Sequence, residues 1–457
     1  MYVFVLSSKS CTPVNETRHG RFHHQAHATA RSVEFNRDMR FHVLGLGPVG
    51  QLFAFHFRRS LSPKHSITLM FKTSPLAKNM LGRPILVERD SVLSKVSGFD
   101  TEASHQLYHD LEDKYSEAER AQFELETVAG TGHRNELLLP SSIPPSAITE
   151  FDNERAKSHI DSLIVCCKAQ STHSAIKRLE RRLSRESTVV LFQNGNLSVY
   201  DQLVKTLFKD EETRPNFILV SNTHGAWLKR PPFHIVHAGI GKIRFGIVPN
   251  GTRDFEKSYY AETGKRTLNL DDIAETDRDP EVARYRSLRN TVAVLQGLSD
   301  LYATWEPFSN IQVHLRQKLV VNCVVNPITA IIGCRNGYLY DNHSATRIAR
   351  QICNEAETVF RKELIANSDS SQEQIDLPKE LLAKNLLNEV RQVIRATGPN
   401  MSSMLVDLKK GNMITEIDFL NGHLQELAVR YNVDAPVNAA LYDLMKLRMS
   451  IPIDTIA

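Results

Sequence analysis

The sequence predicts an α/β fold in which a doubly wound parallel sheet is followed by a mostly α-helical domain. Two observations predict this order. Apolar runs of strand length between residues 41 and 247 end in glycine or polar residues and are separated by helical patterns. From about residue 281, apolar residues recur instead at steps of three and four, as on the buried face of a helix. We therefore expect two domains, the first of them built on a sheet.

The first predicted strand runs into a glycine-rich turn and then into a helical stretch at residues 51–57. This context suits a Rossmann-like dinucleotide site. Gly45 would allow a tight turn, Gly47 would let the backbone approach a pyrophosphate, and Gly50 would permit close helix–strand packing. The helix N-terminus adds free N–H groups. An ordinary turn is the alternative. The candidate cofactor-binding residues here are Gly45, Leu46, Gly47, Pro48, Val49 and Gly50.

Lys72 follows the second predicted strand, residues 65–71, and it bears on the choice of dinucleotide. NAD enzymes usually place an Asp or Glu at this point for the ribose hydroxyls. Here Lys72 precedes Thr73 and Ser74, and a lysine with two hydroxyls would hold a 2′-phosphate that a carboxylate would repel. We therefore expect NADP (NADPH) rather than NAD. The alternative is that Lys72 is a solvated charge at a strand end.

Two more predicted strands, residues 160–169 and 188–196, end in the polar residues Lys168 and Asn194. Ligands of open α/β sheets gather at the carboxyl ends of the strands, so both side chains would face the crevice of the glycine loop. Each alone could equally be a strand-end or turn residue. Further along, residues 217–227 and 234–247 predict more strands, and residues 238–241 predict a hairpin within the second of these segments.

Composition excludes several classes of protein. The 457 residues are 41% hydrophobic and 24% charged, as in ordinary globular proteins. The net charge of +4 comes without a long basic block, so we expect no nucleic acid. No apolar run reaches about 18 residues, so we expect no membrane span. The six cysteines lack paired Cys-x-x-Cys spacing, which indicates free thiols in a reducing compartment, and we expect no metal site.

Changes in composition along the chain suggest its domain boundaries. Residues 1–39 are rich in Ser, Thr, His and Arg with few acids, as in an organelle transit peptide or a disordered tail. We therefore expect a cytoplasmic or mitochondrial protein. We expect the NADP-binding domain at residues 40–250 with an insertion at about 89–157, a linker at 251–280, and the helical domain at 281–457.

Within the helical half, one predicted helix at residues 308–326 carries an unusual polar stripe. Lys318, Asn322 and Asn326 are four residues apart and therefore share one helix face, whereas the other faces are apolar. Such a stripe is unfavourable unless it faces a ligand or a wet cleft, although a solvent-facing side is the alternative. We expect Pro327 to end or kink this helix.

A second polar cluster lies at residues 399–422. Ser402, Ser403, Thr415 and Glu416 could be helix starts, because hydroxyls and carboxylates favour first turns. They could also belong to a site, and both interpretations can hold together.

These residues make the chain resemble the ketopantoate reductase family of the 6-phosphogluconate-dehydrogenase-like superfamily. The resemblance covers residues 40 to about 448, apart from the insertions near 89–157 and 250–280. In its insertions and N-terminal extension the chain is more similar to fungal members than to compact bacterial ones. The motifs that carry the resemblance occur in family order. They are Gly-x-Gly-x-x-Gly at 45–50, Lys-Ala at 168–169, Gln-Asn-Gly at 193–195, Thr-His-Gly-Ala at 223–226, Lys-Leu-x-x-Asn-Cys-x-x-Asn-Pro-x-Thr-Ala at 318–330, Asn-Gly at 336–337, Ser-Ser-Met-x-x-Asp at 402–407 and Thr-Glu-Ile-Asp at 415–418.

The resemblance implies a role for each of these residues. Lys318 would be the proton donor, and a lysine suits this because its cation also stabilises negative charge on oxygen. Glu416 would sit between a substrate hydroxyl and the cofactor. The keto acid would be held by Asn322, Asn326, Asn336 and Ser403, and the cofactor would be lined by Lys72, Lys168, Asn194 and Ala226 beside the glycine loop.

The function implied is NADPH-dependent reduction of 2-dehydropantoate to pantoate, a step towards pantothenate and coenzyme A, by a monomer or a homodimer. Two alternatives stay open at this point. One is reduction of another branched 2-keto acid, and the other is a non-catalytic NADP-binding regulatory protein of the same fold.

Overall fold

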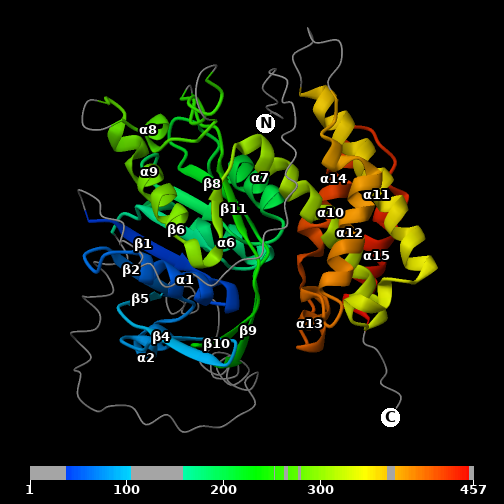
Figure 1. Ribbon diagram of the computed structural model, residues 1–457, viewed down its shortest axis with the longest axis horizontal. Coiled ribbons are helices and arrows are strands. Elements are labelled where there is room, and N and C mark those ends of the chain that lie inside the picture. The colour runs from blue at the N-terminus through cyan, green and yellow to red at the C-terminus, as the bar shows by residue number, and fades with distance from the viewer. Residues whose placement is uncertain are drawn as a thin grey trace, which may run out of the picture.

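The computed structural model describes residues 38–103, 158–251, 253–261, 266–275, 279–367 and 376–451. It consists of an α/β domain followed by a helical domain, and helix α10 (Phe308–Ile332) lies at their junction (Figure 1). The N-terminal extension to residue 37 and most of the predicted insertion, residues 104–157, lie outside the described residues.

The α/β domain is built on an eight-stranded sheet in the order β12-β11-β8-β7-β6-β1-β2-β5. The strands from β8 to β5 run parallel to one another, and β11 runs antiparallel to β8. The bounds are β1 Arg40–Leu44, β2 Ser66–Phe71, β5 Asp100–Ala103, β6 Ser162–Val165, β7 Thr188–Leu191, β8 Asn216–Asn222, β11 Ile243–Ile247 and β12 Ala303–Trp305.

Strand β1 lies at the point where the strand order reverses, because β2 pairs with one edge of β1 and β6 pairs with the other. At such a point the connections leave towards opposite faces, and a crevice opens at the carboxyl ends of the strands. The helices that follow these strands are α1 Pro48–Ser60, α2 Ser74–Met80, α6 Ala169–Leu179 and α7 Asn196–Thr206. The fold therefore presents the residues after β1, β2, β6 and β7 to one crevice.

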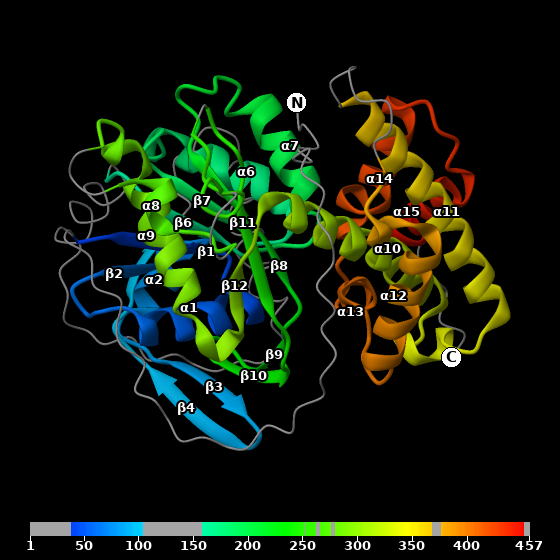
Figure 2. The same cartoon turned by 45° about the horizontal axis from the view of Figure 1, so that its top comes forward.

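A smaller four-stranded sheet, in the order β4-β3-β10-β9, packs beside α1 (Figure 2). The predicted hairpin at residues 238–241 is wrong, because β10 and β11 do not pair. β10 pairs with β9 and β3, whereas β11 pairs with β8 and β12 of the main sheet. Between β10 and β11 the chain passes from the smaller sheet to the main sheet, close to the backbone of Thr223. Gly241 allows this close approach, since a Cβ there would lie 2.3 Å from the carbonyl carbon of Thr223. The bounds are β3 Ile85–Arg89, β4 Val92–Val96, β9 Gly225–Arg230 and β10 His234–Gly239.

Two boundaries of the predicted domains are wrong. Strand β5, inside the predicted insertion, pairs with β2 in the main sheet. Helix α9 (Val282–Gln296) begins the region predicted to be the helical domain, but its side chains Leu288, Val292 and Leu295 pack into the core of the α/β domain. Strand β12 also pairs with β11, so the helical domain begins at Phe308. A helical period identifies a buried face but not the element that covers it.

In the helical domain, later helices pack around α10 (Figures 1 and 2). Its core is separate from those of the sheet and includes Val320, Ile352, Val390 and Leu424. The bounds are α11 His343–Ala366, α12 Ala383–Ala396, α13 Ser403–Lys409, α14 Asn421–Arg430 and α15 Pro436–Ser450, with short 3-10 turns η3 Asn336–Leu339 and η5 Glu416–Phe419. None of the helices in the described ranges is both long enough and apolar enough to span a membrane.

Pro327 does not end helix α10, which continues to Ile332. A proline has no N–H and leaves the carbonyl four residues earlier without its helical partner, here Cys323. The side chain of Asn421 supplies the missing bond, because its Nδ2 donates to the Cys323 oxygen at 3.0 Å. Of the two predicted outcomes, an end or a kink at Pro327, the end is therefore wrong, and the bond that replaces the missing one comes from a residue about a hundred positions away.

The cysteines in the described ranges carry free thiols, as expected from their spacing. Burial raises the pKa of the Cys166, Cys323 and Cys353 thiols, which keeps these groups protonated and unreactive.

Candidate active site

The glycine turn after β1 has the geometry of a dinucleotide loop. Gly45 has a φ of +96°, and a Cβ at this position would lie 2.2 Å from the Cys167 nitrogen. A Cβ at Gly50 would lie 2.0 Å from the Gly45 oxygen, so this residue closes the helix onto the turn. Gly47 is the N-cap of α1, where a Cβ would meet no atom within 4 Å and no side chain caps the helix. The free N–H groups of α1 therefore face an open approach that fits a pyrophosphate.

Lys72 follows β2 directly and is exposed. Lys72 therefore stands at the carboxyl end of β2, and its positive charge acts on the Cys167 thiol, next to the glycine turn. Thr73 is the N-cap of α2 and its hydroxyl caps no backbone N–H. The three residues that follow β2, Lys72, Thr73 and Ser74, include no carboxylate.

Lys168 is the N-cap residue of α6 and forms an ion pair across the domain junction with Asp407 of α13. Asp407 is 6% exposed, whereas about half of the lysine side chain stays accessible. Sequence reasoning identified Lys168 but gave Asp407 no role. The sequence did hold a reason to expect such a partner. A lone lysine at the end of an apolar strand needs a counter-charge if the lysine lines a partly buried site.

Glu416 lies in η5, and both of its carboxylate oxygens accept hydrogen bonds from the α/β domain. Oε1 accepts from the Ala169 N–H at 3.3 Å, and Oε2 accepts from Asn194 Nδ2 at 3.2 Å. Burial raises the pKa of this carboxyl, while the two donated bonds oppose that shift. The residue that precedes it, Thr415, caps η5 by accepting from the Ile417 N–H, so the prediction of a helix start here is confirmed.

Lys318 lies in α10 at the domain junction, and its Nζ donates to the backbone oxygen of Asn222 at 2.8 Å. Asn222 is the last residue of β8, a position that sequence reasoning did not single out. Burial lowers the pKa of Lys318 from 10.5 to about 8, and the negative charge of Glu416 partly opposes the shift. An amine with this pKa is mostly protonated at neutral pH and can still give up its proton, as a general acid must.

Two residues of the polar stripe of α10, Lys318 and Asn322, line a pocket. Lys318, Asn322 and Asn194 line this pocket together. Asn326, one turn further on, is buried, and its backbone oxygen accepts from the Thr329 hydroxyl at 3.1 Å. The structure thus brings together the proposed proton donor Lys318, Asn322 and Asn194, the hydrogen-bond partner of Glu416.

The remaining predicted residues are not joined to Lys318 or Glu416 by hydrogen bonds within the described ranges. Asn336 is buried and donates from Nδ2 to the Thr397 hydroxyl at 2.9 Å. Ser403 is exposed at the start of α13, and its neighbour Ser402 is the N-cap that accepts from the Leu405 N–H, which confirms a helix start. Ala226 lies in β9, opposite His237 of β10.

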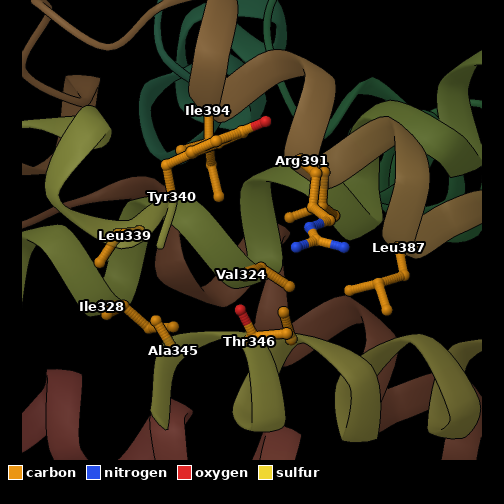
Figure 3. Close-up of a pocket in the computed structure, with 11 residues that line it drawn as sticks. Val324, Ile328, Leu339, Tyr340, Ala345, Thr346, Leu387, Arg391 and Ile394 are labelled. Atoms are coloured by element: carbon orange, nitrogen blue, oxygen red, sulfur yellow. The ribbon is translucent and has the colours of Figure 1, made fainter. Parts of the chain in front are cut away.

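A different pocket opens within the helical domain between α10, η3, α11 and α12 (Figure 3). Its walls are mostly apolar, and the side chain of Arg391 points towards Val324 and Thr346. None of the predicted site residues lines it. The candidate active site is therefore the interdomain region around Lys318.

Fold and site together define a dinucleotide-dependent oxidoreductase with a Rossmann-like domain and a helical domain that supplies a lysine and a glutamate. The family description "Ketopantoate reductase PanE/ApbA" matches residues 115–250, and its C-terminal counterpart matches residues 310–449. The chain belongs to the ketopantoate reductase family.

Individual relatives agree with this assignment. The chain is 28% identical over 298 residues to a probable 2-dehydropantoate 2-reductase of Schizosaccharomyces pombe, covering 64% of this chain and 75% of the relative. It is 29% identical over 290 residues to the 2-dehydropantoate 2-reductase of Shigella flexneri, with the same coverage. In fold it is similar to the probable 2-dehydropantoate 2-reductase of Bacillus subtilis, with a TM-score of 0.55, 19% identity and coverage of 90% and 100%.

A D-mandelate dehydrogenase structure with NADH and anilino(oxo)acetate is similar at a TM-score of 0.58 and 14% identity, covering 90% of this chain and 98% of that one. At this identity the likeness concerns the fold alone.

Proposed function

We propose that the protein reduces 2-dehydropantoate to (R)-pantoate with NADPH. The observation that carries the proposal is the position of Lys318, a partly buried amine at the domain junction whose pKa is lowered to about 8 and whose pocket is shared with Asn194 and Asn322. Relatives named as 2-dehydropantoate 2-reductases match this chain over 64% of its length.

The chain's own residues divide the work of the reaction. When bound, NADPH supplies the hydride. The ammonium of Lys318 donates a proton to the oxygen at C2 of the keto acid and stabilises the negative charge that develops there. The hydrogen bond to the Asn222 oxygen orients this ammonium. Asn322, Asn326, Asn336 and Ser403 hold the keto acid.

Glu416 lies between the two domains and is proposed to bind the substrate hydroxyl beside the cofactor. Its carboxylate already accepts bonds from Ala169 and Asn194, which fixes its position before the substrate arrives. A preformed position reduces the entropy lost on binding.

The cofactor is proposed to be NADP rather than NAD because of the residues after β2. Two groups there suit a 2′-phosphate: the exposed ammonium of Lys72, and the hydroxyl of Thr73, which makes no capping bond to α2. The glycine turn and the start of α1 would hold the pyrophosphate, and Lys168, Asn194 and Ala226 would line the nicotinamide side. The cytoplasmic or mitochondrial location and the monomeric or homodimeric state stay predictions.

The proposal is tested by following the oxidation of NADPH with 2-dehydropantoate as substrate. The full chain is expected to turn over 2-dehydropantoate at least tenfold more efficiently, in kcat/KM, than 2-oxoisovalerate. Equal efficiency with both would instead favour a general reductase of branched 2-keto acids.

A further inference from the structure

His423 is a buried histidine beside the candidate active site to which neither the sequence nor the family resemblance assigns a role. It lies in the first turn of α14 and is 4% exposed. Its side chain lines the pocket that Lys318 and Asn322 line from α10 and that Gln193 and Asn194 line from the end of β7. The histidine therefore reaches the surroundings of the proposed proton donor from the helical domain.

Two of the residues that line this pocket each carry a side-chain atom that is buried without a hydrogen-bond partner in the part of the chain that the structure describes. One is Nδ1 of His423 and the other is Oε1 of Gln193, whose Nε2 donates to the Thr172 hydroxyl at 3.3 Å. Leaving a buried polar atom unpaired is costly, and native proteins commonly satisfy such atoms with an ordered water. Two of them on one small pocket point to a shared partner.

The pocket has the size and the polarity that a single buried water requires. The space between its side chains admits one water-sized sphere, and Lys318, Asn194 and Asn322 add polar groups to its wall. A buried water usually makes about three hydrogen bonds, and the pocket offers partners for each of them.

We propose that His423 is a positioning residue for Lys318, and that it acts through a water molecule held between His423 Nδ1, Gln193 Oε1 and Lys318 Nζ. The inference rests on the proposed function, in which Lys318 is the proton donor. Donors and acceptors balance in this arrangement. The water donates one hydrogen to the imidazole nitrogen and the other to the amide oxygen, and its own oxygen accepts an N–H of the ammonium.

The charges around His423 favour the neutral imidazole that this arrangement needs. Burial lowers its pKa to about 4, and the nearby cations Arg316, Arg430 and Lys205 act in the same direction, against the single anion Glu426. A neutral ring with its proton on Nε2 leaves Nδ1 free as an acceptor. The water thus links Lys318 to an acceptor that carries no charge.

Lys318 depends on such a partner because its other contacts are few. Its Nζ donates to the Asn222 oxygen, and Glu416 is the charged group that acts on it. An ammonium that loses one hydrogen-bond acceptor in a buried site is harder to keep protonated, so its pKa falls. Removing the water should therefore move the titration of Lys318 to lower pH.

The test is the pH profile of kcat/KM for 2-dehydropantoate reduction in His423→Phe, whose ring fills the pocket without a polar atom. The basic limb of the profile is expected to move about one pH unit lower, so that activity falls about tenfold at pH 9 but less than about threefold at pH 6. His423→Asn, which offers an amide oxygen near the position of Nδ1, is expected to restore the parent limb. His173→Phe on α6 is the matched control, since His173 hydrogen-bonds Thr206 and does not line the pocket.

A limb that stays in place in His423→Phe, with the protein folded and NADPH bound, overturns the proposal. If His423→Phe does not fold, Gln193→Met removes the other acceptor and is expected to shift the limb in the same direction. If the parent chain reduces no keto acid, the proposed function fails first, and the water is then judged by a crystal structure of the parent. A water oxygen within about 3.2 Å of all three atoms supports it, and an empty or differently filled pocket contradicts it.

Discussion

The Nζ of Lys318 donates a hydrogen bond to the backbone oxygen of Asn222, and this 2.8 Å contact ties the first helix of the helical domain to the end of strand β8. Other contacts cross the same junction, among them those from Lys168 to Asp407 and from Asn194 to Glu416. Residues from both domains therefore meet where the proposed reaction takes place. Their geometry depends on how the domains dock, so mutations here are expected to change catalysis more than folding.

Replacing Lys318 with alanine is expected to lower kcat for 2-dehydropantoate reduction by about a hundredfold or more, which corresponds to about 3 kcal/mol of transition-state stabilisation. The dissociation constant of NADPH should change little, since the residues proposed to bind the cofactor are others. Steady-state kinetics and fluorescence titration of NADPH measure the two effects. Lys384→Ala on the exposed side of α12 is the control. An unaltered kcat would remove the assigned role.

The pH dependence of reduction should report the pKa of Lys318. Burial lowers this pKa to about 8, so the ammonium needed for proton donation is lost as pH rises through that value. We expect kcat/KM for reduction to be level below this range and to decline above it. Oxidation of pantoate needs the neutral amine and should increase over the same interval. If both directions declined together, a different group would be titrating.

Lys72→Asp is expected to weaken the binding of NADPH far more than that of NADH. The substitution replaces an exposed cation at the end of β2 with an anion that repels a 2′-phosphate. Isothermal titration with both cofactors gives the two affinities. An equal loss for both would show that Lys72 does not read the phosphate, and Lys78→Asp on α2 controls for the change in net charge.

Asn421→Ala is expected to destabilise the protein by about 1–3 kcal/mol, because it leaves the buried Cys323 oxygen unpaired next to Pro327. Urea unfolding measures this change. The same substitution in a Pro327→Ala background should cost about 1 kcal/mol less, since the alanine introduced there has an N–H that bonds the oxygen within the helix. The bond from Asn421 to Asn438 is lost in both backgrounds and cancels. An identical cost in the two backgrounds would contradict this explanation of the unbroken helix.

Much of the cofactor side could be predicted from sequence because its determinants are local. Gly45, Gly47 and Gly50 are constrained by the turn that they form, and the structure shows the positive φ, the open approach and the close packing expected of them. The polar stripe of Lys318 and Asn322 could also be predicted, since helical spacing alone places both residues on one face.

The features that sequence could not predict depend on contacts between distant segments. Helix α9 has the periodicity of any amphipathic helix, and only its packing against the sheet assigns it to the first domain. The bond from Asn421 that preserves α10 spans about a hundred residues. The position of His423 beside the pocket could not be predicted, because the sequence around a histidine in a helix does not show whether its ring nitrogens find hydrogen-bond partners.

The central claim is tested most directly by the rate of NADPH oxidation by residues 40–457, followed by absorbance, with 2-dehydropantoate, 2-oxoisovalerate and pyruvate compared side by side. The account predicts a clear preference for 2-dehydropantoate that is lost in Lys318→Ala while NADPH still binds. NADPH binding without turnover of any of the three keto acids would contradict it.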